Sequence, residues 1–282
     1  MAEVDKELIR ARMAELLQHI GEPQAFDAGL HDLLRILGSE ENVAGAVRFI
    51  PGLGESFGVP VPALGLIAGE LARWGQRHAE EAFALVERLW HNGSRDERVI
   101  AAKALERLGR RQPEKTLELA ASFVGTLRNW EECDQLACFG LREVVQRHPE
   151  WVLPRCRAWV QDEERWTRRF AVAVLTSLPK AKAYRPSGEE FAILEAVMAD
   201  EAREVQDAVD WALREIGKRH PAALADYLRR HAGSANRSTR RIVKRAMKVL
   251  PEEEQAALQA LLAYCHTPAM GSPQNSQALS TM

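Results

Sequence analysis

Apolar residues recur three and four positions apart along almost the whole chain, which is the spacing of an amphipathic α-helix. The pattern is visible in residues 5–20 and is continuous from about residue 79 onward, where Ala, Leu, Glu and Arg are abundant. Runs that alternate β-branched and polar residues are absent, so we expect no sheet. Residues 50–65 (IPGLGESFGVPVPALG) are rich in proline and glycine, and we expect a loop between helices there. The sequence therefore predicts an all-α protein.

Four prolines mark a repeat in the chain. Pro113, Pro149, Pro186 and Pro221 are 36, 37 and 35 residues apart. Each interval contains a shorter helical segment after the proline and a second one before the next proline. This period and content are typical of HEAT-like helical hairpins, which stack into a right-handed α-solenoid whose concave face is lined by the second helix of each hairpin. An all-α bundle in which the prolines recur by accident is the alternative.

The same pattern predicts the domain organisation. We expect one α-solenoid domain over residues 1–265, with residues 1–50 as an N-terminal helical cap and residues 70–250 as HEAT-like repeats. Residues 266–282 are small and polar, and we expect them to form a disordered C-terminal tail. Function in such folds usually resides on the concave face, so the polar residues of the second helices are the candidates to examine.

Composition excludes several classes of protein. The chain has 46% hydrophobic and 28% charged residues among 282, which is typical of a soluble globular protein. Its net charge of −2 gives no basic field over the whole molecule. The cysteines Cys133, Cys138, Cys156 and Cys265 form no CxxC pair, so we expect neither a zinc site nor a disulfide framework. We expect no metal and no cofactor.

The hydropathy of the chain bears on its location. No run of about 18 uncharged apolar residues exists, so we expect no membrane-spanning helix and no membrane partner. The first thirty residues mix acidic and basic positions and lack a continuous apolar core, so we expect no secretory signal. Together these features predict a reduced, soluble protein of the cytoplasm.

The small net charge hides a strongly basic segment. Residues 227–250 contain eight basic residues and no Asp or Glu. The basic residues are Arg229, Arg230, Arg237, Arg240, Arg241, Lys244, Arg245 and Lys248. Several recur at three- and four-residue steps, so most should lie on one side of a helix, as the footprint for a phosphate backbone would. A solubilising surface and an acidic protein partner are the alternatives; we favour a polyanion, of which DNA and RNA are the commonest, because solubilising surfaces usually mix both signs.

Two helical segments carry large polar or aromatic residues outside their apolar stripe. In residues 203–219, Trp211 lies about 130° from the centre of the stripe, so it either packs against a neighbouring repeat or presents its ring to a ligand. In residues 166–179, Arg169 lies nearly opposite the stripe with Arg165 beside it. Exposed arginines are ordinary, so a solvated face is the simplest interpretation of this second pair.

A third helical segment brings an aromatic residue and an acid together. Trp130 and Asp134 are four residues apart, and they lie one above the other if the helix has begun at Trp130. Asp134 is at the flank of the apolar stripe. The simplest interpretation is that Asp134 pairs with an arginine of the next repeat. Glu131 and Glu132 are ordinary first-turn acids, which the positive end of a helix favours.

Three motifs taken together resemble a known family. They are 129-NWEECDQ-135, 165-RWTRRFAVAVL-175 and 208-AVDWALREIGKRHP-221. In this order and spacing they resemble the AlkD-like DNA alkylation repair family, the HEAT-like-repeat DNA glycosylases. The resemblance covers about residues 70–250, and the segment 57-FGVPVPALG-65 is similar to the N-terminal signature of that family.

The resemblance implies a role for each matching position. Asp134 is at the position of the catalytic carboxylate, Trp130 at that of its aromatic partner, and Trp211 at that of a second catalytic aromatic residue. Arg169 is at the position of the arginine that holds DNA beside the lesion. With the basic residues near it and those of the C-terminal segment, the DNA-binding candidates are Arg165, Arg168, Arg169, Arg237, Arg240, Arg241, Lys244 and Lys248.

Two positions depart from the family pattern. Asp207 stands where a basic residue precedes the tryptophan by four positions in the family, which removes one contact to the DNA backbone. Gly65 stands where an arginine or lysine is common after the GVxxP loop, which removes another. Both departures affect the expected affinity and leave the expected chemistry unchanged.

The resemblance also implies the activity. It implies a monomeric, monofunctional glycosylase that hydrolyses the N-glycosidic bond of cationic alkylated purines, such as 3-methyladenine and 7-methylguanine, in double-stranded DNA and without base flipping. It would associate with the nucleoid when bound to DNA. A non-catalytic DNA-binding module of the same fold is the first alternative, and a protein-interaction scaffold, the commonest use of helical solenoids, is the second.

Overall fold

The computed structural model describes residues 5–264, and within these residues every regular element is a helix. The α-helices are α1 (Lys6–Leu16), α2 (Pro23–Leu37), α3 (Glu40–Phe49), α4 (Val61–Trp74), α5 (Ala79–His91), α6 (Arg95–Leu108), α7 (Pro113–Phe123), α8 (Trp130–Gln135), α9 (Arg142–Arg147), α10 (Pro149–Trp159), α11 (Arg165–Leu175), α12 (Glu189–Glu195), α13 (Arg203–Gly217), α14 (Pro221–Ala232), α15 (Arg237–Ala246) and α16 (Glu252–Tyr264). Short turns are η1 (Leu17–His19), η2 (Val124–Thr126), η4 (Leu178–Lys180) and η5 (Met247–Val249), all 3-10, and the π-helical η3 (Leu136–Gly140). The predicted all-α class is confirmed, and the tail predicted for residues 266–282 lies outside the described residues.

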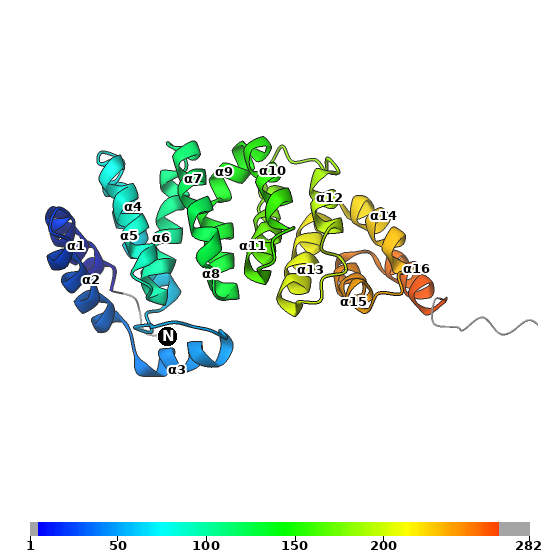
Figure 1. Cartoon of the computed structure of the whole chain (residues 1–282), viewed down its shortest axis with the longest axis horizontal. Coiled ribbons are helices and arrows are strands. Elements are labelled where there is room, and N and C mark those ends of the chain that lie inside the picture. The colour runs from blue at the N-terminus through cyan, green and yellow to red at the C-terminus, as the bar shows by residue number, and fades with distance from the viewer. Residues whose placement is uncertain (1–4, 265–282) are drawn as a thin grey trace, which may run out of the picture.

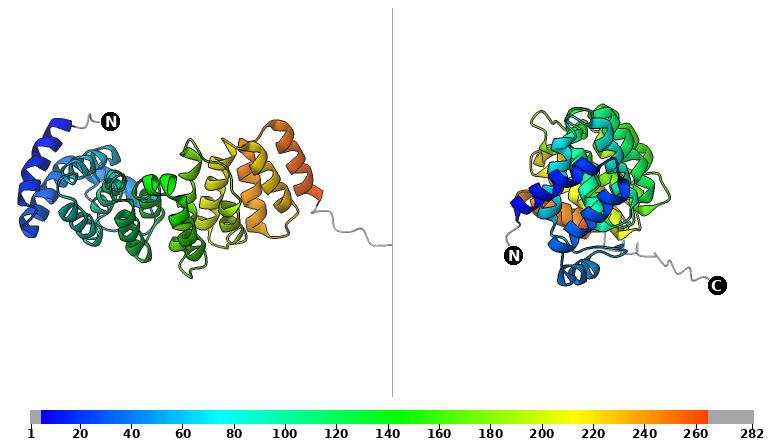
Figure 2. Two further views of the ribbon diagram at one scale, coloured as in Figure 1. Left: turned by 90° about the horizontal axis from the view of Figure 1, so that it is seen from above. Right: turned by 90° about the vertical axis from the view of Figure 1, so that its left-hand side faces the viewer.

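The helices stack side by side along one long axis, in chain order (Figures 1 and 2). Helices α4, α6, α8, α11, α13 and α15 contact one another in sequence along this axis, and we name them the site row. Second-row helices pair with helices of the site row, as α5 does with α6, α10 with α11 and α14 with α15. This arrangement of stacked hairpins is consistent with an α-solenoid.

Prolines mark the starts of second-row helices, as their spacing predicted. Pro113, Pro149 and Pro221 are the first residues of α7, α10 and α14. Proline suits this position because its missing N–H has no partner in the first turn and its φ angle is already helical. Pro186 differs, because it precedes α12 by three residues and lies in a loop.

The predicted loop over residues 50–65 is shorter in the structure. It ends at Pro60, and α4 begins at Val61 with Pro62 in its first turn. The loop is held on α6 by Asp96, whose carboxylate accepts hydrogen bonds from the Phe57 and Val59 backbone N–H groups at 2.8 and 3.0 Å. Proline is compatible with a first turn, so a proline-rich segment does not by itself exclude a helix there.

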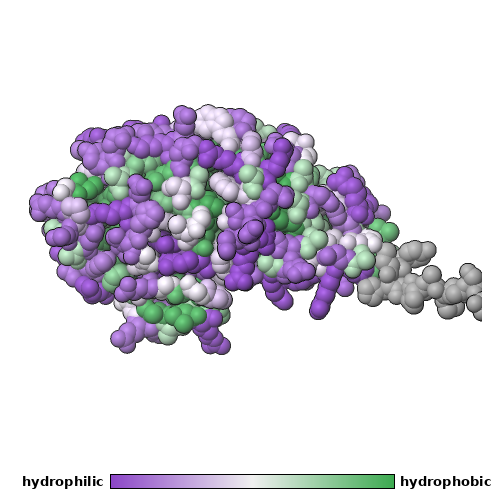
Figure 3. All heavy atoms as spheres, in the orientation of Figure 1, coloured by the Kyte–Doolittle hydropathy of each residue, from purple (hydrophilic) through white to green (hydrophobic). Residues whose placement is uncertain are grey.

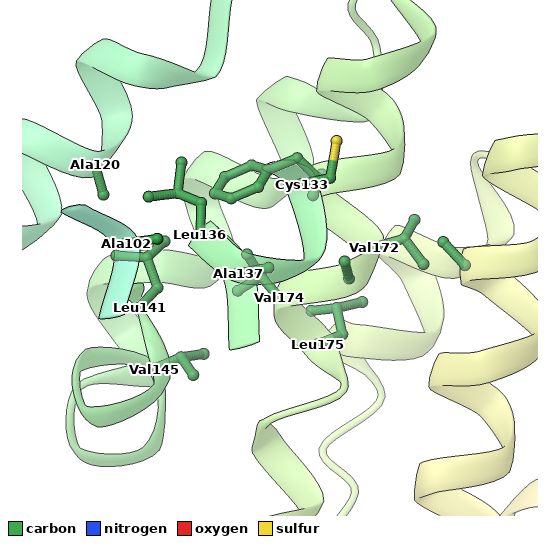
Figure 4. Close-up of a cluster of buried hydrophobic side chains, with 14 of the residues drawn as sticks. Ala102, Ala120, Cys133, Leu136, Ala137, Leu141, Val145, Val172, Val174 and Leu175 are labelled. Carbon is green, nitrogen blue, oxygen red and sulfur yellow. The ribbon is translucent and has the colours of Figure 1, made fainter. Parts of the chain in front are cut away.

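The core runs continuously between the two rows. Figure 4 shows its centre, where small and branched side chains of α6, η3 and α11 meet. They include Ala102, Leu136, Leu141, Val172 and Leu175, each fully buried. This packing fixes the relative positions of α6, α8 and α11, and those three helices carry the site described next.

Candidate active site

The short helix α8 places two of the predicted site residues one turn apart. Asn129 caps the helix, because its side chain accepts a hydrogen bond from the Glu132 backbone N–H at 3.0 Å, and the helix begins at Trp130. Asp134 follows four residues later and lies on the same side. Directly after α8 the backbone widens into the π-helical turn η3, a distortion that is frequent at functional sites. The predicted alignment of Trp130 and Asp134 is confirmed.

An arginine of the next site-row helix holds the Asp134 carboxylate. Arg169 Nη2 donates to both Asp134 oxygens at 2.8 Å, and Arg169 Nη1 donates to the Glu204 carbonyl oxygen at 2.7 Å. The Arg169 side chain is 8% exposed and the Asp134 side chain 22% exposed. The expectation of a solvated Arg169 is wrong, because its guanidinium bridges α8 and α13. The expectation that Asp134 pairs with an arginine of the next repeat is confirmed.

Opposing effects act on the pKa of Asp134. Burial disfavours the charged form and raises the pKa of the carboxyl above its ordinary value, and the nearby Glu131 charge acts in the same direction. The charge and hydrogen bonds of Arg169 lower the pKa and offset part of this shift. Because a carboxylate offers about four acceptor positions, Arg169 leaves some of them free. The Asp134 carboxyl group is therefore held by Arg169 and partly accessible.

Trp130 is fixed through its ring nitrogen. Its Nε1–H donates to the Phe49 carbonyl oxygen at 3.1 Å, which links α8 to the end of α3. The ring packs against the hydrophobic core and is half-buried. Trp130 lies one helical turn before Asp134, so the two residues belong to the same side of α8.

Two buried ion pairs tie the first turn of α8 to the first turn of α6. Arg95 Nε and Nη2 donate to the two Glu131 oxygens at 2.8 and 2.7 Å. Arg98 Nη1 donates to Glu132 at 3.1 Å, and Glu132 also accepts the Arg128 backbone N–H at 2.9 Å. From the sequence both glutamates are expected only as first-turn acids, because their arginine partners lie 36 and 34 residues away along the chain.

Trp211 lies near the middle of α13 (Arg203–Gly217). It follows Glu204 by seven residues, which is about two helical turns, and the Glu204 carbonyl receives Arg169. The ring packs against the core and is half-buried. The packing role predicted for Trp211 is confirmed for the buried part of its surface, and the ligand-contacting role stays a prediction.

The other two arginines of the RWTRR motif differ from each other. Arg165, the first residue of α11, is exposed, with its guanidinium 5.0 Å from the Trp166 ring centre. Arg168 is held by Asp200, at 2.6 and 3.3 Å, and by two backbone carbonyl groups of the preceding loop. Arg165 is therefore free to meet a ligand, and Arg168 holds the loop before its own helix.

The basic residues of α15 divide between two neighbouring helices. Arg241 Nη2 and Arg245 Nη1 each donate to Asp207 of α13 at 2.6 Å, and Arg245 Nε lies 3.0 Å from Asp210. Asp207, which departs from the family pattern, thus ties α13 to α15. It also neutralises part of the predicted phosphate footprint.

The opposite side of α15 faces α16. Arg240 Nη2 donates to the Leu262 carbonyl oxygen at 2.8 Å, and Arg240 and Lys244 line a cleft against α16. The stripe predicted from the spacing comprised Arg237, Arg241, Lys244, Arg245 and Lys248. Its expected one-sidedness is wrong for Lys244, which lines the cleft against α16 while Arg241 and Arg245 contact α13. Arg237, Lys244 and Lys248 are exposed and form no ion pair within residues 5–264.

An arginine that was not predicted from the sequence extends the basic surface. Arg203 is exposed and is the first residue of α13. Arg165 and Arg237 are the first residues of α11 and α15, so three successive site-row helices start with an exposed arginine. A cation is unfavourable at a helix N-terminus, where acids are the stabilising choice. The recurrence of arginine at the first helical position, one repeat apart, was the available sequence signal.

A second cation missed by sequence analysis lies beside Gly65. A Cβ at Gly65 would lie 3.8 Å from the Lys103 side chain, whose ammonium is 3.4 Å from the Phe139 ring centre. Arg142 lies over the same ring at 4.7 Å. Burial lowers the pKa of Lys103, and the Arg142 charge adds to this effect. Lys103 of α6 thus places a positive charge beside Gly65, the position at which the family commonly carries a basic residue.

Other kinds of site receive no support from the described residues. Cys133, Cys138 and Cys156 are buried, and burial raises the pKa of each thiol, which makes them poor nucleophiles. In the part of the chain that the structure covers, His, Cys, Asp and Glu form no group suited to hold a metal ion. No helix in this part is both long enough and apolar enough to span a bilayer.

Comparison with known proteins identifies one family. The model of a family described as "DNA alkylation repair enzyme" matches residues 30–250. No curated protein matches the chain. The matched range contains α8, α11, α13 and α15, and so includes every candidate residue described above.

Proposed function

Because the chain belongs to the DNA alkylation repair enzyme family, we propose that it is a DNA glycosylase that hydrolyses the N-glycosidic bond of cationic alkylated purines in duplex DNA. The observation that carries this proposal is the Asp134 carboxylate, held by Arg169 and partly open to solvent beside Trp130. A protein that only bound DNA would gain nothing from an anion in a surface that meets phosphates.

The chemistry requires stabilisation of a cation on the sugar. Alkylation at N3 or N7 gives the purine a positive charge and makes it a good leaving group. As the bond to C1′ breaks, positive charge develops on the deoxyribose, as it does in glycoside hydrolysis. A fixed carboxylate next to that sugar stabilises the charge and orients the attacking water. Asp134 fills this role, and Arg169 holds it in place and opposes the rise in its pKa.

The two tryptophans complete the site. An indole ring attracts a cation over its face, by about 0.5–2 kcal/mol depending on desolvation. The open parts of Trp130 and Trp211 offer such faces to the positively charged nucleotide. The site then favours cationic lesions over neutral ones, because it supplies electrostatic stabilisation and no general acid.

The product follows from the same scheme. Water attacks C1′, the bond to the purine breaks, and the free base and an abasic site result with both strands intact. The Asp134 side chain is 22% exposed, so it can reach the sugar of a nucleotide that stays in the duplex, without extrusion of the base into a pocket.

The test is to incubate the protein with duplex DNA that contains 7-methylguanine, and to measure free base and binding to the same duplex in parallel. Release of 7-methylguanine supports the glycosylase if a neutral damaged base is released far more slowly from a matched duplex. Binding without release overturns it and favours the alternative, a non-catalytic DNA-binding protein of the same fold.

A further inference from the structure

Helix α3 exposes an apolar surface that the rest of the chain does not cover. It buries none of its residues fully, and Val47 and Phe49 are 60% and 70% exposed. The helix projects from the site row below α4 and α6 (Figure 1), and its apolar side chains form a visible patch on that projection (Figure 3). An exposed aromatic side chain on a projecting element indicates a contact with another molecule.

The projection is firmly attached to the rest of the molecule. Asn42 Nδ2 donates to the Gly58 carbonyl oxygen at 3.0 Å, and the Phe49 carbonyl oxygen accepts the Trp130 ring N–H at 3.1 Å. Gly58 has a φ of +72°, and a Cβ there would lie 2.8 Å from the Val43 side chain. α3 therefore holds Phe49 in a defined position. The backbone carbonyl of Phe49 itself binds the ring N–H of Trp130, a candidate catalytic residue.

The charges around Phe49 indicate the chemistry of its partner. The guanidinium of Arg48 lies 5.8 Å from the Phe49 ring centre. Arg128, 42% exposed, lies against the following loop at 3.4 Å from the Cβ position of Gly54, and its charge is paired with Glu132 at 3.1 Å. Glu55 is the exposed acid of that loop. An apolar side chain with an arginine over its ring matches a surface with phosphates around an apolar interior, which is the composition of a DNA groove.

We propose that α3 is a wedge whose Phe49 side chain contacts the bases of the duplex through the minor groove, next to the nucleotide at Asp134. This inference rests on the proposed function. Proteins that bind the minor groove commonly insert an apolar side chain at a base step and flank it with arginines. The sugar C1′ borders that groove, so a side chain that opens the neighbouring base step brings the sugar toward Asp134 without extrusion of the base.

The test uses a duplex with 7-methylguanine and with 2-aminopurine, whose fluorescence rises when it unstacks, at the neighbouring position. The variants are Phe49→Ala, Phe49→Trp as the conservative change, and Trp151→Ala as the matched control, because Trp151 is an exposed aromatic on the second-row helix α10. We expect the wild type, Phe49→Trp and Trp151→Ala to raise the fluorescence. We expect Phe49→Ala to lose most of the rise and to bind about tenfold more weakly.

Base release measured in the same samples separates this inference from the proposed function. If the wild type releases 7-methylguanine while Phe49→Ala matches it in affinity and fluorescence, the wedge is refuted and the glycosylase stands. If the wild type neither binds nor releases, both are refuted. A third outcome is that the wild type self-associates in sedimentation while Phe49→Ala stays monomeric and binds DNA as well as the wild type. In that case the partner of α3 is a second copy of the chain, and the wedge is refuted.

Discussion

A single guanidinium nitrogen of Arg169 contacts both carboxylate oxygens of Asp134 at 2.8 Å, while its second nitrogen holds the Glu204 carbonyl at 2.7 Å. One side chain of α11 thereby fixes the candidate catalytic group of α8 and joins it to α13. The resemblance to the repair family suggested that Arg169 grips DNA. In this structure its charge is used within the protein, behind the carboxylate that would meet the sugar.

Replacing this arginine should shift the pH dependence of catalysis. The active form of Asp134 is ionised, and burial raises its pKa, so activity is present above that pKa and is lost as the pH falls through it. Arg169→Gln removes the effect that opposes the shift, so the acidic limb of the single-turnover rate should move to higher pH. An acidic limb at the same pH in both proteins would show that Arg169 does not act on the ionisation of Asp134.

The Arg95–Glu131 pair should be strongly coupled in stability. Arg95→Met leaves the Glu131 charge buried without a partner, and breaking a buried pair in this way costs about 3–5 kcal/mol. The double variant Arg95→Met with Glu131→Leu removes both charges and should recover most of the loss. Urea unfolding of the wild type, the single and the double variants measures this. Equal losses in the single and double variants would mean that the pair contributes through packing alone.

Asp207 should restrain DNA binding. Asp207→Ala removes the acidic partner of Arg241, while Arg245 keeps its contact with Asp210 at 3.0 Å. Affinity for duplex DNA should therefore rise and its salt dependence should steepen, by ~0.9 in the slope of log K against log salt if Arg241 engages one phosphate. Asp226→Ala is the matched control, because Asp226 is an exposed acid on the second-row helix α14. A slope unchanged by Asp207→Ala would place this side of α15 away from the DNA.

Two arginines of the basic surface should behave differently. Arg203→Ala removes an exposed cation at the start of α13 and should reduce the salt slope by ~0.9, the value for one phosphate contact. Arg240→Ala should leave the slope nearly unchanged, because Arg240 bonds the Leu262 carbonyl and faces α16. Filter binding at four salt concentrations distinguishes the two. The reverse order would place the DNA on the α16 side.

Features set by short stretches of sequence were predictable. The helical class follows from the three- and four-residue periodicity, and Pro113, Pro149 and Pro221 mark helix starts because proline acts within one turn. The alignment of Trp130 with Asp134 needs only a helix that begins at Trp130, which Asn129 ensures. These relationships involve residues fewer than five positions apart.

Features set by contacts between repeats were not predictable in the same way. A helical wheel places Arg169 opposite the apolar stripe of its own helix, but neighbouring helices cover that side and bury it. In the sequence, Arg241 and Arg245 have no acidic residue near them. In the structure they contact Asp207 of α13, which lies 34 and 38 residues away along the chain. One helix in isolation does not indicate which of its polar faces a neighbour will occupy.

The rate of base release from a preformed complex tests the central role of Asp134 most directly. The measurement compares the wild type with Asp134→Asn under single-turnover conditions, on duplex DNA with 7-methylguanine and with every substrate molecule bound. The account predicts that the variant binds the duplex about as well as the wild type and releases the base at least ~100-fold more slowly, because an amide cannot offset the charge on the sugar. Release at the wild-type rate from fully bound Asp134→Asn would contradict it.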